Sequence, residues 1–281
     1  MRRHHQGLRV LGPADLPDVS RVLAKDPVTN VFVDSRVRLT GLDPRWLGGE
    51  VWGYDEDGEL VSLCHSAANL APVATSDPAL DAFAGHALRQ GRKCGSIVGR
   101  DQEVMTLWRL LESQWGPARS LRPRQPFMTL VSPPLVEPSP DVRAARPDEL
   151  DVLYPACVAM YTEELGISPE LAGGAPAYRA RIAQLISRHH AFVHIEDGEV
   201  VFKAELGAVT PHAAQLQSVW VNPRCRGQGL AAAGVAAICS VALQFIAPVV
   251  CLYVNEHNEP ARRTYDRVGF TETTKFATIL F

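Results

Sequence analysis

The sequence predicts a mixed α/β protein built from two domains. Three observations indicate this: the chain has 281 residues, short apolar runs alternate with amphipathic stretches, and a proline-rich segment interrupts it near the middle. At about 150 residues per domain, this length is enough for two hydrophobic cores. The apolar fraction of 46% is typical of folded proteins and excludes a disordered chain.

The domain boundary is predicted by the segment SPPLVEPSP at residues 132–140. Its four prolines lack backbone N–H groups and fix φ, so they disfavour helix and sheet interior and favour an extended linker. We therefore expect an N-terminal domain at 1–132, a linker at 133–140 and a C-terminal domain at 141–281.

Composition and charge exclude several classes of protein. The net charge is −3 and no block of Lys or Arg occurs, so nucleic-acid binding is not expected. The six cysteines form no C-x-x-C pair, and no apolar run follows the first residues, which predicts free thiols and a cytoplasmic protein. Residues 227–255 carry no charge, but Gln228, Gln244 and Pro248 interrupt them, so a buried helix and strand fit better than a membrane span.

Periodicity places the elements of the C-terminal half in order. Short apolar or alternating runs predict strands, and apolar residues at three- and four-residue spacing predict helices, one of which is stopped by Gly269. A kink is expected at Pro155. The expected strands are 142–145, 191–196, 199–209, 213–221, 249–254 and 276–281, and the expected helices are 148–164, 178–190, one from 227, and 259–268.

The two halves resemble each other weakly. LRVLGPADL at 8–16 matches VRAARPDEL at 142–150, and EDGELV at 56–61 matches EDGEVV at 196–201. Each half also has an amphipathic helix that ends at a glycine, at 116 and 269. The pattern favours an internal duplication, although Asp-Gly turns and prolines at helix starts also recur by chance.

One loop has the features of an anion-binding site. In SVWVNPRCRGQGLAAAG an apolar strand ends before Arg224-x-x-Gly227-x-Gly229, which leads directly into a helix. Two glycines permit a tight turn with N–H groups facing inward, and the helix N-terminus adds partial positive charge, so the segment suits a pyrophosphate. A dinucleotide fingerprint fits less well because the next acidic residue, Glu256, comes too late. A P-loop is excluded because Gly-Lys-Ser/Thr is missing.

A second signature follows in LYVNEHNEPARRTYDRVGF, where a strand leads to Asn255 and Asn258 and a helix then carries Ala261 and Tyr265 on one face. Together the two signatures resemble the Gcn5-related N-acetyltransferase (GNAT) superfamily, in which strand, R/Q-x-x-G-x-G/A and helix precede a strand and N-x-x-A-x-x-x-Y-x-x-x-G-F. The resemblance implies the acyl-CoA N-acyltransferase fold for 141–281, with acetyl-CoA as co-substrate.

The resemblance also implies a site, residue by residue. Tyr265 would protonate the departing thiolate, although an aromatic that packs helix against sheet is the alternative. The implied cofactor-binding residues are Val219, Trp220 and Val221 on the strand, Arg224, Arg226, Gly227, Gln228, Gly229, Leu230 and Ala231 around the pyrophosphate, and Asn255 and Asn258 after the next strand.

The general base is not given by the resemblance. Many members carry a carboxylate where this chain has Gln217 and Ser218. Glu205 is the best candidate, because it interrupts an apolar stretch in which a carboxylate must be satisfied or perturbed, unless it faces solvent on an alternating strand. Weaker alternatives are Glu256, His257 and the terminal carboxylate of Phe281.

The acceptor side is expected at the first two helices of the C-terminal domain. Glu163, Glu164 and Glu170 there would suit a cationic amine, or form a solvated helix end. His190 and His194 lack a sensibly spaced third ligand, so no metal is expected. We expect a small-molecule or peptide amine as acceptor, no nucleic acid, no membrane, and a monomer or homodimer.

The N-terminal half lacks the loop. Its string Arg92-Lys93-Cys94-Gly95 enters a strand rather than a helix, so this half would be a degenerate copy that serves as scaffold or acceptor wall. The sequence thus predicts an acetyl-CoA-dependent N-acetyltransferase in which a primary amine attacks the thioester directly in a ternary complex. The alternative is a non-catalytic CoA-binding sensor or assembly module.

Overall fold

The computed structural model describes residues 7–281 and divides them into two compact units. The first unit contains the described residues up to Phe127 together with Tyr253–Asn258 and Glu272–Phe281, and the second contains Met128–Leu252 and Glu259–Thr271. The first six residues, on which the expectation about a leader segment depended, lie outside the described part. No helix within residues 7–281 is long and apolar enough to cross a membrane.

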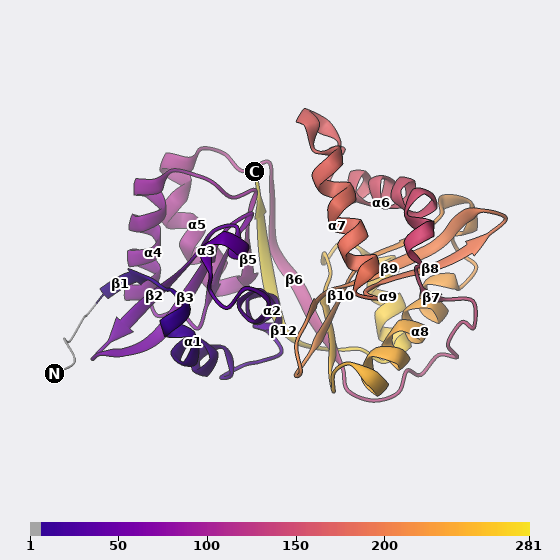
Figure 1. Ribbon diagram of the computed structural model, residues 1–281, viewed down its shortest axis with the longest axis horizontal. Coiled ribbons are helices and arrows are strands. Elements are labelled where there is room, and N and C mark those ends of the chain that lie inside the picture. Colours follow the sequence, from indigo (N-terminus) through magenta and orange to yellow (C-terminus); the bar gives the residue numbers. More distant parts are fainter. Residues whose placement is uncertain (1–6) are drawn as a thin grey trace. The chain divides into compact units, whose positions relative to one another are not determined.

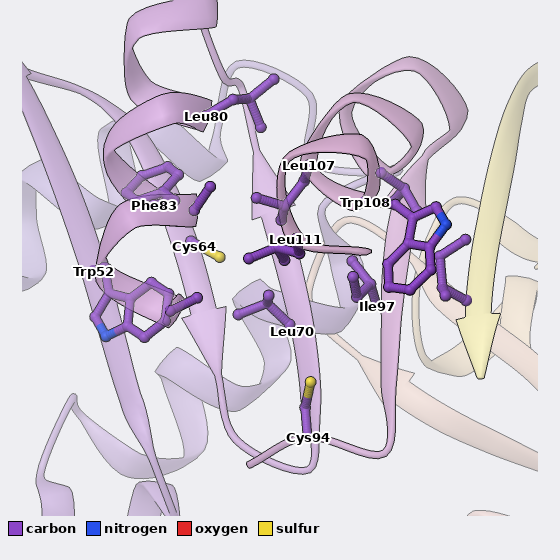
Figure 2. Packing of buried hydrophobic residues seen from close by; sticks show 14 of the residues in the cluster. Trp52, Cys64, Leu70, Leu80, Phe83, Cys94, Ile97, Leu107, Trp108 and Leu111 are labelled. Carbon is purple, nitrogen blue, oxygen red and sulfur yellow. The ribbon is translucent and has the colours of Figure 1, made fainter. Parts of the chain in front are cut away.

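The first unit is a mixed sheet with helices on it (Figure 1), in the strand order β1-β2-β3-β4-β5-β12-β6. Helices α4 and α5 contact each other, and their apolar faces form one core with strand residues such as Trp52, Leu70 and Ile97 (Figure 2). Its elements are β1 Gly7–Val10, α1 Leu16–Leu23, α2 Val31–Thr40, α3 Pro44–Leu47, β2 Glu50–Glu56, β3 Glu59–Ser66, β4 Asn69–Val73, α4 Asp77–Gln90, β5 Ser96–Arg100, α5 Asp101–Trp115, most of β6 Ser120–Leu130, and β12 Thr271–Leu280.

The second unit has the strand order β7-β8-β9-β10-β11. Helices α6 and α7 share a core with one face of these strands, and α8 contacts β9 and β10 (Figure 1). The Phe202 ring on β9 approaches Gly234 on α8 so closely that a Cβ added at Gly234 would lie 2.6 Å from the ring. Its elements are β7 Arg143–Ala144, α6 Leu150–Leu165, α7 Ala175–Ser187, β8 Ala191–Glu196, β9 Glu199–Val209, β10 Ala214–Val221, α8 Leu230–Phe245, β11 Val250–Tyr253 and α9 Glu259–Val268.

The final strand departs from the expected domain boundaries. The sequence predicts contiguous domains, whereas β12 pairs antiparallel with β5 from Phe276 opposite Arg100 to Leu280 opposite Ser96. Its Ala277 and Ile279 are buried in the core of the first unit. The last residues of the chain therefore complete the sheet of the first unit, which no local pattern could reveal.

Element ends differ from the expected ones where backbone conformation decides them. The helix expected from residue 227 begins at Leu230, because Gly227 and Gly229 have φ of 81° and 82°, outside the helical region. α7 begins and ends three residues early, at Ala175 and Ser187. α6 continues past Pro155 to Leu165.

The internal duplication is visible in local geometry. Both Asp-Gly hairpins use two residues of positive φ, as type I′ turns require, and both have a register irregularity just before the turn, at Tyr54/Asp55 and at His194/Ile195. The helix starts are also repeated 134 residues apart. Arg9 pairs with Asp15 and Arg143 with Glu149, and each acid also accepts the N–H three residues before it.

Candidate active site

The open edge of β10 is the first element of the site. β10 pairs in parallel with β11 at Ala214 and Gln215, and within the described chain no partner strand continues beside its remaining residues on that side. On the other side, its register with β9 shifts between Gln217 and Trp220, where Ser218 has φ of 55°. A bulge of this kind bends a strand and interrupts its ladder. Main-chain groups of residues 216–221 are thereby presented along a splayed edge.

The loop after β10 is the second element. The Asn222 side chain accepts the N–H of Arg224 and starts a single 3₁₀ turn, which the two positive-φ glycines follow. Within residues 7–281, the N–H groups of residues 227–231 donate no hydrogen bond of standard geometry. A row of unpartnered N–H groups at the N-terminus of a 16-residue helix is an anion-binding arrangement, so the residues present fit a pyrophosphate.

The two arginines of the loop have different surroundings. Arg224 is exposed, with Glu199 as its ion-pair partner at 3.6 Å. Arg226 donates from Nε to the Val221 carbonyl at 3.0 Å and from Nη2 to Glu163 Oε2 at 2.7 Å. Glu163 Oε1 in turn accepts the indole N–H of the buried Trp220 at 3.0 Å. This use of Glu163 could not be predicted from the sequence, because 63 residues separate it from Arg226.

A buried ion pair lies on the face of β9 that is covered by α6 and α7. Lys203 Nζ is 2.5 Å from Glu205 Oε1, and both side chains are almost completely buried. Burial alone would raise the pKa of Glu205 and lower that of Lys203, but each charge stabilises the other, so the pKa of Glu205 is lowered and that of Lys203 raised. Glu205 therefore faces the interior, not solvent.

Two further groups complete this cluster. Gln217 Nε2 donates to Glu205 Oε2 at 3.3 Å, from the residue directly opposite on β10. Lys203 Nζ also lies 3.4 Å from Cys157 Sγ on α6. Burial raises the pKa of the Cys157 thiol, which keeps it protonated at neutral pH. The pairing of Lys203 with Glu205 was not predicted from the sequence. The available signal was a lysine two residues before an acidic residue in an apolar strand, because side chains at that spacing lie on the same face.

Tyr265 lies on α9 with its side chain buried and its ring edge-on to Phe270 at 5.8 Å. Burial raises the pKa of its hydroxyl, with the Glu164 charge as a smaller cause. The hydroxyl is therefore protonated at neutral pH, as a proton donor must be. The packing against Phe270 also supports the structural alternative, and both roles are compatible with this position.

Asn255 and Asn258 belong to the first unit. The Asn255 oxygen accepts from Gln125 Nε2 at 2.9 Å, and Gln125 accepts from the Thr278 hydroxyl at 2.6 Å. The loop they share lines a cavity of about 390 Å³ together with residues 120–124. Glu256, an alternative base, is ion-paired with Arg124 at 3.1 Å.

The acidic residues expected on the acceptor side are engaged within the protein. Glu163 is shared between Trp220 and Arg226, and Glu170 accepts the hydroxyl proton of Tyr154 at 3.0 Å. Among residues 7–281 no cluster of three or more His, Cys, Asp or Glu could hold a metal ion, and His194 pairs with Glu196. All six cysteines are free thiols.

In the first unit, strands β4 and β5 separate after a short parallel pairing, as β10 and β11 do in the second unit. β4 and β5 pair in parallel at Asn69 and Leu70 only. In the segment between β4 and α4, the N–H of Thr75 donates a hydrogen bond to Glu103 Oε1 at 3.1 Å. The hydroxyl of Ser76 donates to Glu56 Oε1 at 2.7 Å. Two carboxylates thus accept hydrogen bonds from the segment that precedes α4 in the first unit.

Two family models match parts of this chain. Residues 157–270 match the Acetyltransferase (GNAT) family, and residues 49–153 match a domain of unknown function (DUF4081). The C-terminal part of the chain is a GNAT acetyltransferase domain. No curated protein matches the sequence significantly.

Solved structures extend the GNAT fold to the whole chain. A Drosophila protein covers 99% of both chains at TM-score 0.67 and 12% identity. The match to a tandem GNAT protein from the clavulanic acid biosynthesis pathway covers 97% of this chain and 98% of that protein, with a TM-score of 0.56 and 15% sequence identity. The match to a GCN5-related N-acetyltransferase from Sphaerobacter thermophilus covers 96% of this chain and 93% of that protein, with a TM-score of 0.57 and 20% sequence identity. These similarities show the fold, and the tandem GNAT arrangement predicted from the sequence is confirmed.

Proposed function

We propose that this chain is an acetyl-CoA-dependent N-acetyltransferase with one working site, in the GNAT domain. The observation that carries the proposal is the row of unpartnered N–H groups at residues 227–231, placed directly after the open edge of β10. A pyrophosphate is the anion that such a cradle suits, and an extended amide-containing arm is the ligand that an open strand edge suits.

Acetyl-CoA, when bound, would supply a thioester carbonyl that a neutral amine can attack. The N–H groups of residues 227–231 would hold its pyrophosphate, and main-chain groups of Val219 and Val221 would hold its pantetheine arm. Tyr265, protonated because burial raises its pKa, would give its proton to the departing sulfur.

Glu205 is the proposed proton acceptor for the amine. Lys203 holds its Oε1, so Oε2, which accepts only the longer bond from Gln217, is the oxygen that would face a proton donor. A carboxylate whose pKa is lowered is a weak base. The amine's own deprotonation would therefore dominate the pH dependence of the rate.

Calorimetric titration with acetyl-CoA, followed by thiol release across a panel of primary amines, tests the proposal. We expect one binding site per chain and thiol release that depends on both substrates. Among residues 7–281, the carboxylate beside the bulge on β10, Glu205, is ion-paired with Lys203, and this favours a second candidate, a non-catalytic CoA-binding module. Binding without thiol release for any small-molecule or peptide amine would support that module, and no binding would contradict both functions.

A further inference from the structure

Glu163 joins three parts of the second unit. It lies two residues before the end of α6, accepts the indole N–H of Trp220 on β10 with Oε1, and accepts the Arg226 guanidinium of the loop with Oε2. Trp220 is anchored in the core between α6, α7 and the sheet. The carboxylate is therefore held in place by a buried partner, and it also binds the half-exposed guanidinium of Arg226.

The position of Arg226 conflicts with the binding of a cofactor. Its Nε hydrogen-bonds the Val221 carbonyl, which lies on the open edge of β10, where the pantetheine arm is expected. The charge of Arg226 is neutralised by Glu163 at 2.7 Å. The neighbouring N–H groups of residues 227–231, which suit an anion, have no hydrogen-bond partner within residues 7–281. In this arrangement Arg226 occupies the Val221 carbonyl, which the pantetheine arm would need, and its charge is paired with Glu163 rather than available to a pyrophosphate.

Resting on the proposed function, we propose that Glu163 is a positioning residue that holds Arg226 in a cofactor-free position, from which the guanidinium transfers to the pyrophosphate when the cofactor binds. The exchange is favourable because Arg226 and Glu163 are both about half exposed, at 48% and 45%, and exposed pairs are weak. A pyrophosphate carries more charge than one carboxylate and suits the planar fork of arginine.

The transfer has two simultaneous effects. It releases the Val221 carbonyl for the pantetheine arm, and it removes the Arg226 contact from the end of α6, leaving Glu163 bonded to Trp220. Cofactor affinity is thus reduced by the strength of the contact that must be broken. Removing the carboxylate should raise affinity, and should do so only while Arg226 is present.

Calorimetry with coenzyme A on the full chain tests this, using Glu163→Gln, Arg226→Gln and the double variant. Glu163→Gln keeps an oxygen for the Trp220 indole but loses the charge. We expect it to bind coenzyme A roughly two- to fivefold more tightly than the wild type, the range an exposed ion pair allows. Arg226→Gln should bind more weakly, and Glu163→Gln should have no effect in that background. Glu164→Gln, one residue away, is the charge-matched control and should bind like the wild type.

Each other outcome is decisive. Equal or weaker binding by Glu163→Gln overturns the proposal, because the carboxylate would then be neutral or helpful to the cofactor. An equal gain with and without Arg226, or in Glu164→Gln, overturns it too, because general electrostatic repulsion would explain the gain. If no variant and no wild-type protein binds coenzyme A, the proposed function itself fails. Thermal melting of each variant verifies folding, and Arg226→Met, which also removes the charge, replaces Arg226→Gln if the latter is unstable.

Discussion

Lys203 and Glu205 form a salt bridge of 2.5 Å inside the second unit, with side-chain exposures of 1% and 6%. The pair lies two residues apart on β9, beside Gln217 on β10 and Cys157 on α6. A buried pair of this kind contributes less to stability than its geometry suggests, whereas breaking it leaves one buried charge unpaired.

Glu205→Gln should therefore lower the free energy of unfolding by about 3–5 kcal/mol, because it leaves the buried Lys203 ammonium without its charged partner. The double variant Lys203→Met/Glu205→Gln should recover most of that loss, since no buried charge remains. Chemical denaturation measures both. A double variant as unstable as the single one would show that the pair is not the cause.

The same variants separate stability from catalysis. If Glu205 accepts the proton of the amine, the double variant should be stable and yet slower than the wild type at pH 7, and the difference between their rates should shrink toward pH 9 as the amine deprotonates by itself. A double variant with wild-type rates at every pH would exclude Glu205 as the base.

Gly227→Glu should abolish acetyl-CoA binding, because a carboxylate would enter the cradle of N–H groups. No atom of residues 7–281 lies within 4 Å of a Cβ added at this position, so the effect is electrostatic rather than a clash. Gly227→Ala is the matched control: it adopts the same strained φ of 81° without a charge, and should retain measurable binding.

The stoichiometry of the wild type tests the role of the first unit. The carboxylates of Glu103 and Glu56 occupy the segment before α4, so only one acetyl-CoA should bind per chain. Calorimetric titration gives the number directly. Two equivalent sites per chain would contradict a degenerate first unit.

Tyr265→Phe should lower kcat by roughly 10²–10⁴ if the hydroxyl protonates the departing thiolate. Acetyl-CoA affinity and melting temperature should change little, because the ring and its contact with Phe270 remain. Phe270→Leu is the control, since it weakens the packing but keeps the hydroxyl. Full activity in Tyr265→Phe, with low stability in Phe270→Leu, would assign Tyr265 to packing alone.

His65 predicts a pH-dependent stability for the first unit. Within residues 7–281 neither ring nitrogen has a hydrogen-bond partner of standard geometry, and burial, followed by the Arg36 charge, outweighs the nearby Asn69 backbone and lowers the pKa of the ring from 6.5 to about 4. Because the folded protein resists protonation, the stability of the neutral form is complete above pH 6.5 and is lost as the pH falls toward 4.

His65→Leu should therefore melt at a higher temperature than the wild type, by an amount that grows between pH 7.5 and pH 4. His212→Leu, at an exposed position, is the control. Scanning calorimetry at several pH values measures the difference. A constant difference at all pH values would mean that only packing, not protonation, distinguishes the two side chains.

Local patterns in the sequence were enough for most elements of the C-terminal half and for the backbone of the loop at residues 224–229. Gly227 and Gly229 have the positive φ that the motif requires, and the Asp-Gly hairpins form turns with the expected backbone, since these features depend on a few adjacent residues. In the C-terminal half the strand and helix order followed from periodicity for the same reason, and only the ends moved by a few residues.

The tertiary structure alone decided the partners of the charged groups and the place of the last strand. Glu163 meets Arg226 across 63 residues, Glu103 takes the Thr75 N–H across 28, and β12 joins β5 although some 170 residues separate them. Alternation along β9 places Lys203 and Glu205 on one face, but only the helices packed on that face bury them and shift their pKa values. A one-dimensional pattern determines which side of an element a residue occupies, whereas burial and pairing depend on what the folded chain brings against that side.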